Sequence, residues 1–231
     1  RWDPTSGWFL LAEHCRRAEN SASHFGFSFD PGEIRDSLRL HEEKLQGESE
    51  GNDVFRVRMV VNRRGEVRIS HRRIAPARDI ESVAIALERI DPCNRFLYHK
   101  TSKRAGYDRA LRSAQKMGLF DLVFLNDRGE VAEGARSNVV IRQGSQHFTP
   151  PVDCGLLPGL FRQYLLDSQE IAIEERVLYP EDIASADEVF LCNSVRCLQR
   201  VELVDDFSGS RFTSLDDIRY EIKFNFGQEI Y

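Results

Sequence analysis

The stretch EVAEGARSNVVIR, residues 130–142, places a carboxylate inside an otherwise apolar strand pattern. Glu133 is followed at once by Gly134, which interrupts the strand. A charged side chain in such a segment costs free energy unless a partner compensates it. Glu133 could therefore hold a cationic ring nitrogen. The alternative is a glutamate on an edge strand that faces water.

A lysine elsewhere in the chain extends this hypothesis. Lys100 ends the apolar run in FLYHKTSKRAGYD, residues 96–108. Burial disfavours the charged form of an amine, so a lysine at the end of a buried segment can have a lowered pKa and form a Schiff base. The alternative is a surface lysine whose stem covers apolar atoms. Lys103, three residues later, has the surface interpretation only.

A helix start supplies a third feature. In CGLLPGLFRQYLL, residues 154–166, Pro158 and Gly159 precede a helix that begins near Leu160. Free N–H groups at a helix start can bind phosphate, although most such loops are simple turns. A Schiff-base lysine, a carboxylate for a pyridinium nitrogen and a phosphate-binding helix start are together the parts that pyridoxal phosphate needs.

The bulk composition excludes several classes of function. The 231 residues carry a formal net charge of −5, without the basic excess of a nucleic-acid-binding protein. No apolar run approaches the roughly 18–20 residues of a membrane helix. The five cysteines form no CxxC pair and the histidines have no ligand spacing, so we predict neither a metal site nor a disulfide framework. We expect reduced thiols in a cytoplasmic protein that binds a small molecule.

Hydrophobic periodicity predicts an α+β fold with two subdomains. In the first part, helices are followed by a hairpin over residues 54–70 and a strand over 82–90, which we expect to be antiparallel. In the second part, helices over 104–117 and 213–227 enclose short strands, with residues 131–142 as one strand interrupted by Gly134. The predicted subdomains are residues 1–92 and 93–231.

Several motifs, taken in order, resemble those of the fold-type IV pyridoxal-phosphate enzymes, which include branched-chain and D-amino acid aminotransferases and aminodeoxychorismate lyases. The motifs are HKTSKR at 99–104, EGARSN at 133–138, FTPP at 148–151, LLPG at 156–159 and FLCNS at 190–194. The resemblance extends from LLAEHCRR to LVDD. It implies the two-subdomain, D-amino acid aminotransferase-like architecture and pyridoxal 5'-phosphate as cofactor. The family usually has a strand before RWDP, so we expect the first N-terminal strand to be missing.

The resemblance also implies roles for individual residues. Lys100 matches the catalytic lysine that forms the Schiff base and carries the proton, and Glu133 matches the glutamate that pairs with the pyridine nitrogen. Arg17, in the His14–Arg17 pattern, matches a phosphate-binding arginine. The implied cofactor-binding residues are Arg17, Lys100, Glu133, Asn138, Leu160, Phe161, Asn193 and Ser194. The candidate substrate residues are Arg104, Tyr107 and Arg95, with Arg56 and Arg58 as further candidates for a substrate carboxylate.

Within the family, Arg104 lies four residues after Lys100, as in aminodeoxychorismate lyases. The implied reaction eliminates pyruvate from 4-amino-4-deoxychorismate and gives 4-aminobenzoate for folate synthesis. The alternatives are a class IV aminotransferase acting on D- or branched-chain amino acids and a catalytically silent domain that keeps the fold. The resemblance further implies a homodimer and a chorismate-using synthase component, fused or separate, as partner.

Overall fold

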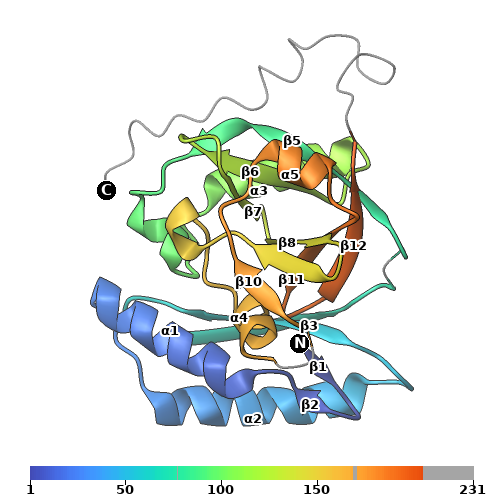
Figure 1. Ribbon diagram of the computed structural model, residues 1–231. Coiled ribbons are helices and arrows are strands. Elements are labelled where there is room, and N and C mark those ends of the chain that lie inside the picture. The colour runs from blue at the N-terminus through green and yellow to red at the C-terminus, as the bar shows by residue number, and fades with distance from the viewer. Residues whose placement is uncertain (77, 169–170, 205–231) are drawn as a thin grey trace. The chain divides into compact units, whose positions relative to one another are not determined.

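The structure is a computed structural model that describes residues 1–76, 78–168 and 171–204 (Figure 1). The chain forms two compact units, Arg1–Ala77 and Arg78–Tyr231. The helix predicted for residues 213–227 lies outside the described residues.

The first unit is a four-stranded antiparallel sheet with two helices. The strand order is β2–β1–β3–β4. The elements are β1 (Trp2–Asp3), β2 (Gly7–Trp8), α1 (Leu11–Phe25), α2 (Pro31–Glu48), β3 (Phe55–Val61) and β4 (Val67–Arg73). The predicted hairpin over residues 54–70 is confirmed as β3 and β4, and two helices precede it as predicted.

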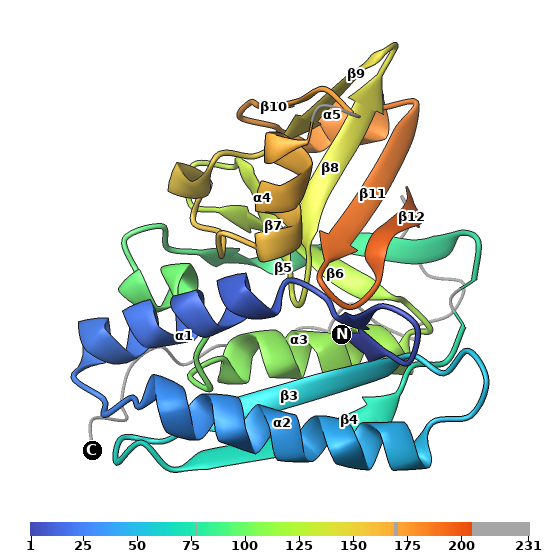
Figure 2. The same cartoon turned by 90° about the horizontal axis from the view of Figure 1, so that it is seen from below.

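Helix α2 begins where its capping residue predicts. The Asp30 side chain accepts hydrogen bonds from the backbone N–H groups of Gly32 (2.7 Å) and Glu33 (3.2 Å), and Pro31 occupies the first turn. Leu45 of this helix is buried with Trp2 and Phe55. Figure 2 shows α2 alongside β3 and β4, so this apolar contact attaches the helix to the sheet.

A pair of histidines joins α2 to β4. His71 Nδ1 lies 2.9 Å from His41 Nε2, and His71 Nε2 lies 2.9 Å from Glu48 Oε2. At that separation one histidine must accept the hydrogen bond through a neutral nitrogen, because two charged rings would repel. Burial, followed by the charges of His71 and Lys44, lowers the pKa of His41, against the opposing charge of Glu48.

We predict that acid weakens this contact. Because the pKa of His41 is lower in the folded chain, the unfolded state binds more protons as pH falls through the ordinary histidine value of about 6.5. Stability is therefore full above that pH and decreases below it. Urea unfolding one pH unit above and one pH unit below the ordinary histidine pKa measures the loss in the free energy of unfolding. NMR titration of the ring signals gives the pH midpoint of His41.

His41→Gln should remove this part of the pH dependence, whereas His24→Gln, outside the pair, should leave it unchanged. An unaltered pH dependence in His41→Gln would contradict the prediction.

The second unit is built on an eight-stranded sheet of order β10–β9–β8–β11–β12–β5–β6–β7, which an additional β7–β8 pairing closes into a barrel-like ring (Figure 1). The strands are β5 (Glu81–Ile90), β6 (Asp121–Asn126), β7 (Val131–Gly134), β8 (Asn138–Gln143), β9 (Gln146–Thr149), β10 (Ile173–Glu175), β11 (Glu188–Asn193) and β12 (Cys197–Leu203). The helical segments are η1 (Arg95–Tyr98), α3 (Ala105–Lys116), η2 (Val152–Cys154), α4 (Leu160–Asp167) and α5 (Pro180–Ala184).

Strand β6 is buried along its whole length because apolar groups cover both of its faces. Val123 and Leu125 belong to one core cluster of the sheet, whereas Leu122 and Phe124 pack in a second cluster that includes Ala114 of α3. A strand covered on both sides has a continuous apolar run instead of alternation, which explains the sequence DLVFLN.

The boundary between the units differs from the predicted division after residue 92. Strand β5 runs parallel to β6, with Val83 opposite Asp121, and parallel to β12, with Val201 opposite Glu81. Residues 81–90 therefore belong to the second unit and are not part of an antiparallel meander. Apolar side chains on a strand do not show the direction of its neighbours, so the sequence pattern assigned β5 to the preceding hairpin.

Candidate active site

The carboxylate of Glu133, at the end of β7, is buried and held from two sides. Glu133 is only 7% exposed. The Tyr107 hydroxyl donates to Oε1 at 2.9 Å, and the Leu157 backbone N–H donates to Oε2 at 3.0 Å. Burial raises the pKa of Glu133 to about 7, while these two donors and the charges of Lys100 and Arg104 act in the opposite direction. Glu133 is thus a buried acid that can change its protonation near neutral pH.

The segment after Glu133 is a tight turn and not an interrupted strand. β7 ends at Gly134, β8 begins at Asn138, and Glu133 pairs across with Asn138. The buried Asp121 carboxylate organises the turn, since it accepts hydrogen bonds from Ala135 N (3.0 Å) and Ser137 Oγ (2.6 Å). A Cβ on Gly134 would lie 2.8 Å from Asp121 Oδ2, so this close approach requires glycine.

Asn138 connects the turn to the loop before α4. It lies in β8 between Glu133 on β7 and Cys192 on β11. Its Nδ2 donates to the backbone oxygen of Leu157 at 2.9 Å, while the N–H of the same Leu157 contacts Glu133. One peptide segment therefore fixes the LLPG loop against both side chains, and Gly159 follows two residues later.

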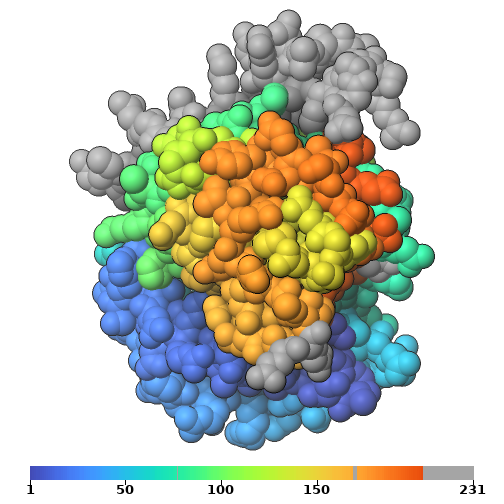
Figure 3. Space-filling model, in the orientation of Figure 1, coloured from blue at the N-terminus to red at the C-terminus, as the bar shows by residue number. Residues whose placement is uncertain are grey.

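The N-cap position of α4 is a glycine, which has no side chain to cap the helix. Gly159 occupies the N-cap position, and the first helical residues are Leu160 and Phe161. The first N–H groups of a helix lack partners within the helix and can bind an anion. Phe161 and the neighbouring Arg162 are buried, whereas Tyr164 is exposed. Helix α4 (amber) and helix α5 (orange) lie at the surface of the second unit in Figure 3.

The buried Arg162 side chain connects α4 to two neighbouring segments of the second unit. It is 2% exposed, its Nη2 donates to Pro150 O at 2.7 Å, and the same atom forms an ion pair with Glu175. A buried guanidinium is stable only when such partners compensate its lost hydration. Arg162, Asp121 and Leu157 were not identified from the sequence as residues of the site. Arg162 could have been noticed in GLFRQ, because an arginine there lies within an otherwise apolar helix face.

Lys100 is exposed, which corrects the prediction of a lysine in a buried segment. The buried residue of that segment is Leu97, on η1; Tyr98 and His99 are partly buried, and Lys100 is the first exposed residue after them. The charge of Lys100 nevertheless lowers the pKa of Glu133, so the two charges interact, and the catalytic role of Lys100 stays a prediction.

The three candidate substrate residues have different surroundings. Arg104 donates through Nε to Asp108 at 2.8 Å and through Nη2 to Ala135 O at 2.6 Å, so it links α3 to the turn after Glu133. The Tyr107 hydroxyl is directed to Glu133. Arg95 lies on η1 with its guanidinium 5.4 Å from the ring centre of Phe96.

Asn193 and Ser194 lie where β11 turns into β12. The Asn193 Oδ1 accepts from the backbone N–H groups of Val195 and Arg196, both at 2.9 Å, and its Nδ2 is 3.4 Å from Arg136 O. The Asn193 side chain therefore shapes the turn, and contacts to a phosphate from this turn stay a prediction.

Arg17 belongs to α1 of the first unit, with Nη2 3.4 Å from Nδ1 of His14. Its role toward a phosphate stays a prediction, as do the roles of Arg56 and Arg58 on β3 of that unit.

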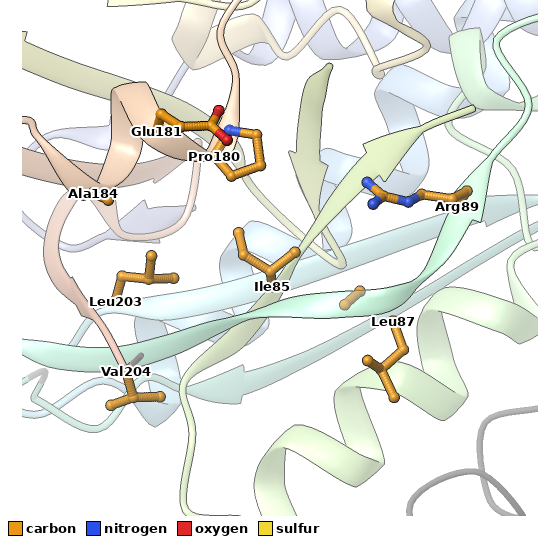
Figure 4. A pocket seen from close by; sticks show the side chains of 9 residues that line it. Ile85, Leu87, Arg89, Pro180, Glu181, Ala184, Leu203 and Val204 are labelled. Atoms are coloured by element: carbon orange, nitrogen blue, oxygen red, sulfur yellow. The ribbon is translucent and has the colours of Figure 1, made fainter. Parts of the chain in front are cut away.

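A separate apolar groove of about 510 Å³ lies between β5, α5 and the end of β12 (Figure 4). Its lining includes Ile85, Leu87, Pro180, Leu203 and Val204, with no lysine among the lining residues. The predicted cofactor residues are elsewhere, so the chemistry of the Glu133 cluster, and not the size of a cavity, identifies the candidate site. Within the described ranges, no cluster of three or more metal-ligating side chains is found, and no helix could cross a membrane.

A family profile described as amino-transferase class IV matches residues 1–204. The chain belongs to this family. A putative aminodeoxychorismate lyase of Schizosaccharomyces pombe is 29% identical over 200 residues, which are 81% of each chain. A putative amino-acid aminotransferase from Mesorhizobium loti is 32% identical, with a TM-score of 0.79 over 88% of this chain and 96% of that one.

Two more distant structures confirm the fold-type IV architecture of this class IV chain. A putative 4-amino-4-deoxychorismate lyase from Legionella pneumophila is 21% identical, with a TM-score of 0.74 over 95% of this chain and 87% of that one. A hypothetical aminotransferase from Mycobacterium tuberculosis, solved in a PLP-bound form, is 22% identical, with a TM-score of 0.71 over 85% of this chain and 76% of that one.

Gly159→Ala should destabilise the class IV site. The new Cβ would overlap the Asn138 amide oxygen, and Asn138 is only 4% exposed, so its side chain must move and lose its hydrogen bond to Leu157. We expect a loss of about 1–3 kcal/mol in the free energy of unfolding, measured by urea denaturation.

Gly47→Ala is the matched control, because a Cβ at Gly47 in α2 meets nothing within 4 Å. It should be neutral or stabilise the protein by up to about 1 kcal/mol. If Gly159→Ala unfolds at the same midpoint urea concentration as the wild-type protein, the Asn138–Leu157 hydrogen bond does not stabilise the fold as we expect.

Proposed function

We propose that this chain is a pyridoxal-phosphate-dependent aminodeoxychorismate lyase, which converts 4-amino-4-deoxychorismate into 4-aminobenzoate and pyruvate. The observation that carries the proposal is the similarity to the Schizosaccharomyces pombe putative lyase, which extends over 81% of both chains. The Lys100–Arg104 spacing supports the same choice.

The residues of the site fit pyridoxal 5'-phosphate, which is the cofactor. Each oxygen of Glu133 receives one hydrogen bond and retains a lone pair for a further donor, as a ring N–H requires. The start of α4, where Gly159 is the N-cap residue, offers backbone N–H groups and the helix dipole to a phosphate. Lys100 supplies an exposed amine whose charge acts on Glu133.

The bound cofactor supplies an electron sink for carbanion chemistry. Glu133 holds the proton at the ring nitrogen, and a cation opposite its carboxylate favours the ionised form of Glu133. Lys100 Nζ would hold the cofactor aldehyde and would serve as the base that removes and returns substrate protons. The backbone at Leu160 and Phe161 would orient the cofactor through its phosphate.

An aminotransferase is the second candidate, favoured by the 32% identity to the Mesorhizobium loti protein. The two reactions differ in their stoichiometry. Elimination breaks the carbon–oxygen bond to the pyruvyl group, the ring loses a proton and becomes aromatic, and one substrate gives both products. Transamination needs a keto acid to accept the amine. A homodimer and a chorismate-using synthase component as partner stay predictions.

The lyase proposal predicts that the purified protein releases pyruvate and 4-aminobenzoate in equal amounts from 4-amino-4-deoxychorismate without a keto acid. Pyruvate is measured with a coupled dehydrogenase and aminobenzoate by its fluorescence. If amino-acid product forms only when a keto acid is supplied, the chain is an aminotransferase and the lyase proposal is wrong.

Lys100→Ala should abolish covalent attachment of the cofactor. The wild-type protein is expected to show the visible absorbance of bound cofactor and to retain it after borohydride reduction and denaturation, because reduction fixes the lysine–cofactor bond. The variant should lose this fixed absorbance and at least about 10³-fold in turnover, since nucleophile and base are removed together.

Lys103→Ala is the matched control. Lys103 is exposed, three residues away, with Nζ 4.2 Å from the ring centre of Phe96. It should keep both absorbance and turnover. A wild-type protein that binds no cofactor would instead favour the catalytically silent domain.

A further inference from the structure

The Tyr107 side chain is held both by packing of its ring and by a hydrogen bond from its hydroxyl. Tyr107 lies in the first turn of α3, and its ring meets Phe124 of β6 edge-on, with centroids 4.9 Å apart and planes at 72°. The hydroxyl donates to Glu133 Oε1 at 2.9 Å. Burial and the charge of Glu133 raise the pKa of Tyr107 above its usual range, so the hydroxyl keeps its proton and remains a donor.

Glu133 has one direct donor on each oxygen. Leu157 donates from the backbone, so no side-chain substitution removes that contact, and Tyr107 donates from a side chain. Lys100, from the segment before α3, and Arg104, from its N-cap, act on Glu133 through their charges. Tyr107 is thus a neutral side chain that, together with the Leu157 N–H, directs the carboxylate and favours its ionised form.

We propose that Tyr107 is a positioning residue, which holds the Glu133 carboxylate in the orientation and charge state in which it meets the cofactor's ring nitrogen. This inference rests on the proposed function. It assigns the Tyr107 hydroxyl to Glu133 and not to the substrate, and it explains why a tyrosine occupies a buried place where phenylalanine would fill the same space.

The test is Tyr107→Phe, which removes one oxygen and keeps the ring against Phe124. In the cofactor-free protein, carbon NMR of the glutamate carboxyl groups, assigned through Glu133→Gln, should show the Glu133 midpoint rising above about 7. The expected rise is about one pH unit, which is tenfold in proton affinity.

In the holoenzyme, the cofactor should bind about tenfold or more weakly at neutral pH, and the acidic limb of the turnover profile should move to higher pH. The substrate KM should change by less than about twofold, because Tyr107 acts on Glu133 and does not contact substrate.

Tyr98→Phe is the matched control. Its hydroxyl is also partly buried in the second unit and donates to Pro92 O at 2.6 Å, away from Glu133. It should leave the Glu133 midpoint and cofactor affinity unchanged. In a Glu133→Gln background, Tyr107→Phe should have little further effect on cofactor affinity, since the double substitution isolates the pairwise coupling.

Several outcomes would overturn the inference. They are an unchanged Glu133 midpoint in Tyr107→Phe, a loss of affinity that is equally large in the Glu133→Gln background, or a change confined to substrate KM. If Tyr107→Phe does not fold, the wild-type Tyr107 ring signals must shift at the Glu133 midpoint, and their failure to shift would also overturn it. Absence of cofactor binding by the wild-type protein would defeat the proposed function, while the NMR result on Tyr107 would stand.

Discussion

The candidate site depends on the cost of burying one carboxylate. Glu133 is almost completely removed from water, and burial raises its pKa to about 7. The surrounding structure compensates this cost with a tyrosine hydroxyl, a backbone N–H and two nearby positive charges. The two groups that donate hydrogen bonds to Glu133, the Tyr107 hydroxyl and the Leu157 N–H, are neutral, so a cation opposite the carboxylate would compensate its burial further.

The same constraint organises the backbone around the site. Glu133 can be presented only if the chain turns sharply after it, and Asp121 makes that turn by accepting the N–H of Ala135 and the hydroxyl of Ser137. Leu157 then joins the turn to the start of α4 through both of its peptide groups. A second buried carboxylate thus supports the first, and the loop before α4 is hydrogen-bonded to Glu133.

Local chemistry was readable from the sequence, whereas long-range pairing was not. A glutamate in an apolar segment indicated Glu133, and alternation over residues 54–70 indicated the hairpin of β3 and β4. The division after residue 92 was wrong for β5, because the parallel partners β6 and β12 are distant in sequence. The strand predicted for residues 131–142 is two strands, since the turn at Gly134 depends on Asp121, ten residues before the segment begins.

Arg104 illustrates how a motif spacing can serve the fold as well as the substrate. Its position four residues after Lys100 distinguishes the lyase-like pattern, yet its donors contact Asp108 in its own helix and Ala135 in the turn after Glu133. An arginine at the start of α3 therefore ties together the two segments that carry the amine and the carboxylate. Selection for that link alone would preserve the spacing. The choice between elimination and transamination accordingly depends on the groups that contact the substrate, because the roles proposed for Lys100 and Glu133 are common to both reactions.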